Sequence, residues 1–350
     1  YQSYPTTYRR NIALTDLYEP GSTFKIFTAA AAIDLGIANA EREFYSGPSW
    51  SVGGGSVRSS NIYGHGRINF LEAVEKSDNI AFAQLSVEMG PERFYPYLAN
   101  FGFGKKSGID FPGEAVGIVP KPGQIAHGET LQWANIGFGQ GIAVTPLQML
   151  MAACAVANNG TVMRPYYVAQ IRDENGKILK TTEPQVLSQA IKPETAETLT
   201  EYLVSAVNNG SGSRARVVGI EIAGKTGTAE VPTQGGYGED RVASFIGFGP
   251  AEDPEIAVLV VLYRPQIEIR YGGVIAAPVF QSVAEQVLDY LGIPRKQTKV
   301  AADGMAVVPN VRNYPIAEAE KILKEHRLTA NYVNEGTIVR DQIPNPGSRV

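Results

Sequence analysis

Apolar residues recur at helical spacing in four long stretches of the chain, and each stretch stops close to a glycine. Glycine is common just past a helix end, because it adopts a left-handed backbone without strain. Thr145, Pro146 and Gln148 add a start signal, since a threonine cap, a proline and a glutamine in this order are typical of a helix N-terminus. The pattern predicts helices over residues 24–35, 146–159, 195–207 and 277–291.

Strand-like patterns gather before the last of these helices. Residues 218–223 alternate weakly between apolar and polar, residues 242–247 follow a glycine-rich turn at 235–238, and residues 256–263 are almost continuously apolar. Such segments, joined by turns, are typical of an antiparallel meander. Together with the helices they predict an α+β fold, in which an antiparallel sheet is flanked by helices.

The character of the chain changes after Gly292. Residues 293–299 are polar and without periodicity, as in a linker, and the residues beyond suggest a strand from 308, a helix over 316–325 and a strand over 328–333. We therefore predict a domain of residues 1–292, a linker of residues 293–304 and a small α+β module of residues 305–350.

Composition narrows the function. With 350 residues, 44% of them apolar, the chain can bury a large core, and its net charge of −4 argues against a nucleic-acid partner. The single cysteine, Cys154, lies in an apolar run and is expected to be a small buried core residue. His65, His127 and His326 are too widely spread for metal-ligand spacing, so we expect no metal site.

Ser22 and Lys25 form the first candidate catalytic pair. Ser22 is predicted to open the first helix, where backbone N–H groups and the helix dipole stabilise a developing oxyanion. Lys25 lies one turn further on the same face, so its amine can reach back to the serine hydroxyl. A lysine is a base only when neutral, so burial or a second cation, for which Lys225 is the candidate, must lower its pKa. Without the other motifs, a helix cap at Ser22 and a solvated surface lysine at Lys25 would explain the pair better than a catalytic role.

Two serines compete for a second motif. Ser59 begins a Ser-Ser-Asn sequence, but it lies in the glycine-rich stretch 53–66, which we interpret as an exposed hairpin or loop. Ser77 begins Ser-Asp-Asn and lies between a short helical pattern at 70–74 and an apolar run that starts at Ile80. A tight junction between two packed helices can aim a side chain rigidly, so we favour Ser77.

The side chains of this junction have distinct expected roles. Ser77 would relay a proton between Lys25 and a leaving amine, and the amide of Asn79 would hold a backbone carbonyl of the substrate. Asp78 is expected to point away from the reacting centre.

A third motif, Lys225, Thr226, Gly227 and Thr228, is predicted to lie at the head of a strand, directly after residues 218–223. A strand edge lets a peptide bind in β-fashion, and Gly227 would leave room for that approach. Thr226 and Thr228 can hydrogen-bond a carboxylate, to which Lys225 adds charge. The N–H of Thr228 would complete an oxyanion hole with that of Ser22.

The glycine-rich residues 137–141 lack the spacing and the strand-to-helix context of a nucleotide-binding loop. We interpret them as a place of close backbone packing near the cleft.

The three motifs, with their surroundings at residues 19–25 and 223–229, resemble the transpeptidase domain of class B penicillin-binding proteins, and residues 305–350 resemble a PASTA module. The resemblance implies a peptidoglycan D,D-transpeptidase without a cofactor. Such an enzyme attacks the D-Ala-D-Ala end of a stem peptide, releases D-Ala and passes the acyl group to an amine, and β-lactams acylate the same serine. The residues carried over are catalytic Ser22, Lys25, Ser77 and Asn79, and substrate-binding Lys225, Thr226, Gly227 and Thr228.

Two other functions fit the same motifs. A serine β-lactamase or D,D-carboxypeptidase must deliver water to the acyl-enzyme, which class A β-lactamases do with a glutamate in an E-x-x-x-N loop. No glutamate between Asn79 and Lys225 has an asparagine four residues later. A non-catalytic β-lactam sensor also shares the motifs, but we do not expect it to carry a C-terminal PASTA-like segment.

The resemblance also implies a location and partners. No stretch reaches the roughly 18 apolar residues of a membrane span, and no signal peptide is visible. We expect an N-terminally incomplete piece of a protein anchored at the extracytoplasmic face of a bacterial membrane, in a Gram-positive-type envelope, with a membrane glycosyltransferase as partner. The PASTA-like module is expected to be C-terminally incomplete and to act as a spacer or docking element.

Overall fold

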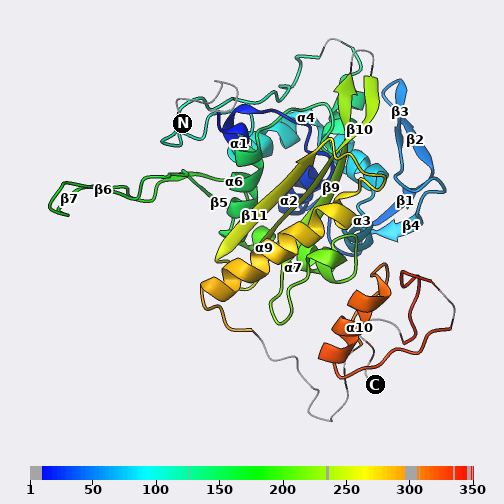
Figure 1. Cartoon of the computed structure of the whole chain (residues 1–350). Coiled ribbons are helices and arrows are strands. Elements are labelled where there is room, and N and C mark those ends of the chain that lie inside the picture. Colours follow the sequence, from blue (N-terminus) through cyan, green and yellow to red (C-terminus); the bar gives the residue numbers. More distant parts are fainter. Residues whose placement is uncertain are drawn as a thin grey trace.

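A three-stranded antiparallel sheet forms the centre of the protein (Figure 1). The computed structural model describes residues 10–125, 127–233, 236–295, 306, 308–333, 336–344, 348 and 350. The sheet has the order β11–β10–β9, with β9 at Ala223–Thr233, β10 at Gly236–Gly249 and β11 at Ile256–Tyr263. The predicted α+β fold is therefore confirmed.

Helices cover both faces of this sheet. On one face, Phe245 of β10 packs against Phe280 of α9 (Ala277–Tyr290), with ring centroids 4.6 Å apart. Ile246 and Phe248 belong to the larger core on the other face, because successive residues of a strand point to opposite sides. The helices of this larger core are α2 (Lys25–Asp34), α3 (Phe70–Lys76), α4 (Asn79–Asn100), α5 (Glu129–Ile136), α6 (Pro146–Ala157) and α7 (Pro193–Asn208).

Local signals placed most of these helices well. The hydroxyl of Thr145 accepts the N–H of Gln148 at 3.1 Å, and the Gln148 side chain accepts the N–H of Thr145 at 3.0 Å, as expected for a capping box. The long helix α4 carries a kink at Gly90, whose φ of 70° is not helical.

The first predicted strand is wrong in position. Residues 218–222 form no strand, and only an isolated bridge joins Val217 to Ile220. Gly219 turns the chain there with a φ of +76°. The strand instead begins at Ala223. The third motif therefore lies near the start of β9, as predicted, and Lys225 pairs with Ile246 of β10. Residue 235 of the predicted turn lies outside the described residues.

Short two-stranded ladders and turns complete the main domain. The pair β6–β7 extends away from the rest of the molecule (Figure 1). The ladders are β1 (Glu43–Ser46) with β4 (Gly66–Asn69), β2 (Ser49–Val52) with β3 (Gly55–Arg58), β5 (Thr161–Met163) with β8 (Val186–Gln189), and β6 (Gln170–Arg172) with β7 (Ile178–Thr181). The remaining short elements are α1 (Ile12–Thr15), η2 (Gly21–Phe24), η3 (Ser213–Ala215) and α8 (Gly272–Ile275).

The C-terminal module contains the helix α10 (Ile316–Glu325), as the sequence predicts. Ala319 and Leu323 face inward and pack with Val311 and Tyr314 in a small core. The expected strand over residues 328–333 does not form. At the start of the module, the backbone pairs with the C-terminal residues: Ala306 and Val350 exchange bonds of 2.6 and 2.9 Å, and the N–H of Val308 donates to Ser348 at 2.8 Å. An isolated bridge joins Pro315 to Ile338.

The module also contacts the main domain. The hydroxyl of Tyr314 donates to the carbonyl of Ser213 in η3, and a guanidinium nitrogen of Arg214 donates to the carbonyl of Asn313 at 2.6 Å. The guanidinium of Arg216 lies over the Tyr314 ring, 5.4 Å from its centroid.

Cys154 is exposed, so the expectation of a buried core residue is wrong. Leu147, Leu150 and Ala157 share this less buried face of α6, because they lie three, four or seven positions away. Desolvation of the thiol nevertheless raises its pKa to about 11. The thiol is therefore protonated near neutral pH and is a poor nucleophile.

Candidate active site

Ser22 lies in η2, a tight 3₁₀ turn that leads directly into α2. The sequence predicts Ser22 at the start of the helix itself, but the α-helix begins at Lys25. The turn packs between residue Gly139 and strand β9. The N–H of Gly21 donates to Gly139 at 2.9 Å, and a Cβ placed on Gly21 would lie 2.9 Å from the Cβ of Ala229 in β9. The backbone thus fixes where the Ser22 side chain starts.

The glycine-rich residues 137–141 support this turn by close packing. A Cβ placed on Gly139 would lie 2.2 Å from the carbonyl oxygen of Gly21 and 2.7 Å from the Cβ of Phe24. The hydroxyl of Thr28 donates to the carbonyl of Gly137 at 2.8 Å. The interpretation of this segment as close backbone packing therefore agrees with the structure.

We expect Gly139→Ala to destabilise the protein by about 2–5 kcal/mol, because a left-handed alanine and an overpacked contact each add to the cost. Gly139 has a φ of +81°. Gly36→Ala is the matched control: its φ is +68°, but a Cβ there would meet nothing within 4 Å. Denaturant unfolding should therefore show the smaller loss for Gly36→Ala, and equal losses would contradict the packing argument.

Lys25 is buried, with 1% of its surface exposed, and its amine is directed at the second motif. It donates to the carbonyl oxygen of Ser77 at 2.6 Å and to Oδ1 of Asn79 at 2.8 Å, and it lies 3.3 Å from the Ser77 hydroxyl. Two of these partners can only accept hydrogen bonds. They match the two N–H groups of a neutral amine, and its lone pair remains for a hydroxyl.

Burial lowers the pKa of Lys25 well below its ordinary value, and the charge of Lys225 lowers it further, whereas Asp78 acts in the opposite direction. Lys225 is the cation that the sequence suggests for this purpose. Burial also lowers the pKa of Lys225, to about 7. The surroundings of Lys25 thus favour the neutral amine that a general base requires.

The junction between α3 and α4 brings Ser77 and Asn79 to Lys25. Ser77 ends α3 with a left-handed backbone (φ 58°, ψ 46°), and the side chain of Asp78 caps α4 by accepting the N–H of Ala81 at 2.7 Å. A left-handed non-glycine residue is strained by about 1–2 kcal/mol, so its surroundings must hold it there.

Ser59, the competing serine, has other partners. Its hydroxyl accepts the N–H of Asn61 at 3.2 Å, and its own N–H donates to Pro48 at 3.0 Å. It follows the β2–β3 hairpin, as the glycine-rich pattern suggests. The contacts of the Lys25 amine thus favour Ser77.

The third motif lies on β9, an edge strand of the sheet. Lys225 is 1% exposed, and its amine has no hydrogen-bond partner among the described residues. The hydroxyls of Thr226 and Ser211 lie 2.8 Å apart, and the Thr228 hydroxyl accepts the N–H of Gly272 at 3.0 Å. Ser211 and Gly272 are site neighbours that the sequence reasoning missed.

Gly227 is needed for packing as well as for access. A Cβ there would lie 2.3 Å from the Ser244 hydroxyl and 2.9 Å from a methyl carbon of Thr23. Glycine at this position therefore lets the turn that carries Ser22 approach β9 closely.

A cavity of about 300 Å³ lies beside the site, lined by Tyr18, Glu19, Ile118, Glu230 and Tyr263 among others. Its lining includes no residue of the three motifs. The carboxylate of Glu19 accepts the N–H of Gly141 at 3.0 Å, so it is directed toward the 137–141 segment. Within the described ranges, no cluster of three or more potential ligands could hold a metal ion.

The chain matches two protein-family models. Residues 1–285 match the penicillin binding protein transpeptidase domain, and residues 306–350 match the PASTA domain. Stage V sporulation protein D of Bacillus subtilis is 35% identical over 360 residues, covering 100% of this chain and 55% of that protein. PbpB of Mycolicibacterium smegmatis is 33% identical over 295 residues, covering 81% of this chain and 45% of that protein. The chain thus spans about half the length of these relatives.

Solved structures agree. The structure of penicillin binding protein 3 from Mycobacterium tuberculosis with ampicillin matches with a TM-score of 0.75 and 29% identity, over 82% of this chain and 65% of that one. The D,D-transpeptidase domain from Eggerthella lenta matches with a TM-score of 0.74 and 31% identity, over 81% and 68%. The chain therefore belongs to the class B penicillin-binding protein family, with a transpeptidase domain and a C-terminal PASTA domain.

Proposed function

We propose that this chain is the catalytic part of a peptidoglycan D,D-transpeptidase, in which Ser22 is the nucleophile. The observation that carries the proposal is the buried amine of Lys25, which lies three residues after Ser22 in the chain. Its N–H groups donate to Ser77 and Asn79. A serine hydroxyl needs such a base to attack an amide carbonyl. Family membership supports this reaction and its substrate, the D-Ala-D-Ala end of a stem peptide.

The positions of these residues support the following steps. The Ser22 oxygen attacks the carbonyl carbon of the penultimate D-Ala while its proton passes to the neutral amine of Lys25. The Ser77 hydroxyl, 3.3 Å from that amine, relays a proton to the leaving nitrogen as the amide bond breaks. An acceptor amine then attacks the ester carbonyl, the C–O bond to Ser22 breaks, and the proton that the amine loses passes to the Ser22 oxygen. The side-chain amide of Asn79 would hold a backbone carbonyl of the donor peptide.

Binding of the substrate carboxylate is assigned to β9. The Thr228 oxygen accepts a bond from Gly272, which leaves its O–H free to donate to a carboxylate. Lys225 supplies charge from a buried amine without a described partner, and Thr226 adds a second hydroxyl. The N–H groups of Ser22 and Thr228 would form the oxyanion hole, since alternate N–H groups of an edge strand point outward.

The proposal also includes inhibition by β-lactams and a location in the cell envelope. The M. tuberculosis relative is a complex with ampicillin, and the shared fold supports acylation of Ser22 by penicillins here. Peptidoglycan substrates would place the domain at the extracytoplasmic face of the membrane, with a glycosyltransferase as partner. In the described ranges, no helix is long and apolar enough to cross a bilayer.

The family matches support the proposed domain boundaries. One match ends at residue 285 and the other starts at residue 306, which agrees with domains of residues 1–292 and 305–350.

We expect the penicilloyl ester on Ser22 to persist after free drug is removed. Hydrolysis of that ester needs a base aimed at a water molecule, which is worth about 10²–10⁴-fold in rate. No E-x-x-x-N glutamate is present between the second and third motifs, and Glu19 is directed toward Gly141. Mass spectrometry over time should find the adduct on the peptide that contains Ser22. Free Ser22 recovered within seconds, with repeated turnover of penicillin, would favour a β-lactamase.

A further inference from the structure

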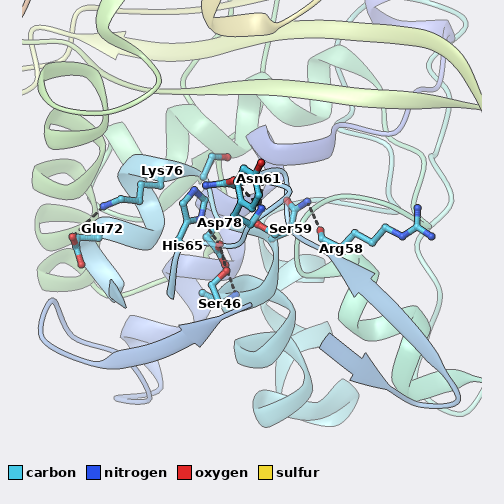
Figure 2. A network of polar contacts seen from close by, with 12 residues as sticks. Ser46, Arg58, Ser59, Asn61, His65, Glu72, Lys76 and Asp78 are labelled. Carbon is cyan, nitrogen blue, oxygen red and sulfur yellow. Dashed lines mark hydrogen bonds and ion pairs between the residues drawn. The ribbon is translucent and has the colours of Figure 1, made fainter. Parts of the chain in front are cut away.

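Behind the second motif lies a buried carboxylate, Asp78, with partners from three segments. None of its side chain is exposed. Oδ1 accepts the N–H of Ala81, while Oδ2 accepts the Ser46 hydroxyl at 2.5 Å and lies 2.8 Å from Nδ1 of His65. Figure 2 shows Asp78 between Ser46 and His65. Burial raises the pKa of Asp78, but these hydrogen bonds and the charge of Lys25 bring it below its ordinary value.

His65 is held in place by its backbone. Gly64 and Gly66, on either side, have φ angles of +73° and +71°. A Cβ on Gly64 would lie 2.4 Å from the carbonyl oxygen of Ser46, and the N–H of His65 donates to that same oxygen at 2.8 Å. Only 15% of the His65 side chain is exposed. The interpretation of residues 53–66 as an exposed hairpin or loop is therefore wrong for His65.

Asp78 connects this histidine to the Lys25 amine. The carbonyl of Ser77, which accepts from Lys25 at 2.6 Å, belongs to the peptide bond that joins Ser77 to Asp78. Asn79, the other acceptor, follows directly in the chain. The N–H of Asp78 donates to the carbonyl of Ala73 at 2.9 Å. With Asp78 fixed on both its backbone and its side chain, the strained turn at Ser77 cannot relax away from Lys25.

We propose that His65 is a positioning residue for the acylation step: with Ser46 it holds Asp78, and through Asp78 it holds residues 77–79 against the Lys25 amine. The inference rests on the proposed function, because it gives His65 a role in that reaction. Since a carboxylate can only accept, Nδ1 must carry the proton that faces Asp78. The proposed role of residue 65 therefore requires one N–H donor to Asp78 at the position of Nδ1.

Asp78 also affects the protonation of Lys25. Within the described residues, two charged groups shift the pKa of Lys25: Lys225 on β9 lowers it, and Asp78 at the start of α4 raises it. Asp78→Asn should therefore lower the pKa of Lys25 further. The neutral amine is the base, so the acylation rate falls when the amine is protonated at low pH. In Asp78→Asn this fall, the acidic limb of the plot of rate against pH, should move to lower pH.

The test compares three replacements of His65 in the full chain. His65→Asn places an amide N–H near the position of Nδ1, His65→Gln places it near Nε2, and His65→Leu removes it. We expect His65→Asn to stay close to the wild-type rate of penicillin acylation, and His65→Gln and His65→Leu to fall by about 10²-fold, since small misplacements of a catalytic group have effects of this size. His326→Leu, in the PASTA domain, is the matched control with an unchanged rate.

Stopped-flow acylation with a fluorescent penicillin gives the rates, and thermal melting reports whether each variant is folded. Wild-type rates in folded His65→Leu, or a folded His65→Asn as slow as His65→Gln, would overturn the inference. An acidic limb that does not move in folded Asp78→Asn would contradict the effect of the Asp78 charge on Lys25. If His65→Leu does not fold, the comparison of Asn with Gln decides. Absence of labelling at Ser22 in the wild type would instead reject the proposed function itself.

Discussion

Ser22→Ala is expected to abolish covalent attachment of penicillin while leaving the fold intact. Loss of the nucleophile removes the only atom that can form the ester in the proposed reaction, and in serine hydrolases such a change lowers the rate by about 10⁶-fold. The turn itself should persist, because backbone contacts hold it: the N–H of Gly21 donates to Gly139, and Gly21 packs on Ala229.

The measurement is labelling with a fluorescent penicillin, followed by mass spectrometry of the intact protein. Ser59→Ala is the matched control, since Ser59 begins the competing Ser-Ser-Asn sequence and contacts Asn61 and Pro48. It should keep the wild-type labelling rate. Undiminished labelling of folded Ser22→Ala would place the nucleophile elsewhere and reject the mechanism.

Much of the fold was predictable because its signals are local. The capping box at Thr145 and Gln148 marks the start of α6 within the sequence itself. The stops near Gly210 and Gly292 likewise place the ends of α7 and α9 within a few residues. These signals depend on backbone geometry over a single turn, so they do not need the tertiary structure.

Strand boundaries were harder, because pairing between distant residues decides them. Residues 218–223 alternate like a strand, yet Gly219 turns the chain, and the pairing with β10 begins only at Ala223. The small ladder of β1 with β4 joins segments about twenty residues apart, and each of its strands has only four residues. The side-chain pattern of such short strands cannot be told from that of a loop.

The motifs predicted which residues to consider, and the structure adds how they meet. The expected bond from Lys25 back to Ser22 is replaced by bonds from Lys25 to Ser77 and Asn79, more than fifty residues away in sequence. Asp78, expected to point away, contacts Ser46 and His65 and still influences the Lys25 amine. The Gly-His-Gly sequence around His65 was a signal for a fixed histidine, but a glycine-rich stretch resembles an exposed loop.

Lys25→Arg is expected to remove nearly all acylation, even though the positive charge is kept. A guanidinium has a pKa above about 12 and does not deprotonate in a protein, so it has no lone pair to take the Ser22 proton. Lys25 is also 1% exposed, so the larger guanidinium would have to fit into a buried site. Lys192→Arg is the control, because the Lys192 side chain is 67% exposed and pairs with Asp34 at the surface.

The pH dependence separates loss of the base from simple misfolding. In the wild type, acylation should be present above the lowered pKa of Lys25 and be lost as the pH falls through it, because only the neutral amine accepts a proton. In Lys25→Arg no rise should appear at any pH up to about 10, well below the guanidinium pKa. Lys25→Gln, which is uncharged but cannot act as a base, should be equally inactive and covers the case in which the buried arginine unfolds the protein. Wild-type acylation in either folded variant would show that another group takes the proton from Ser22.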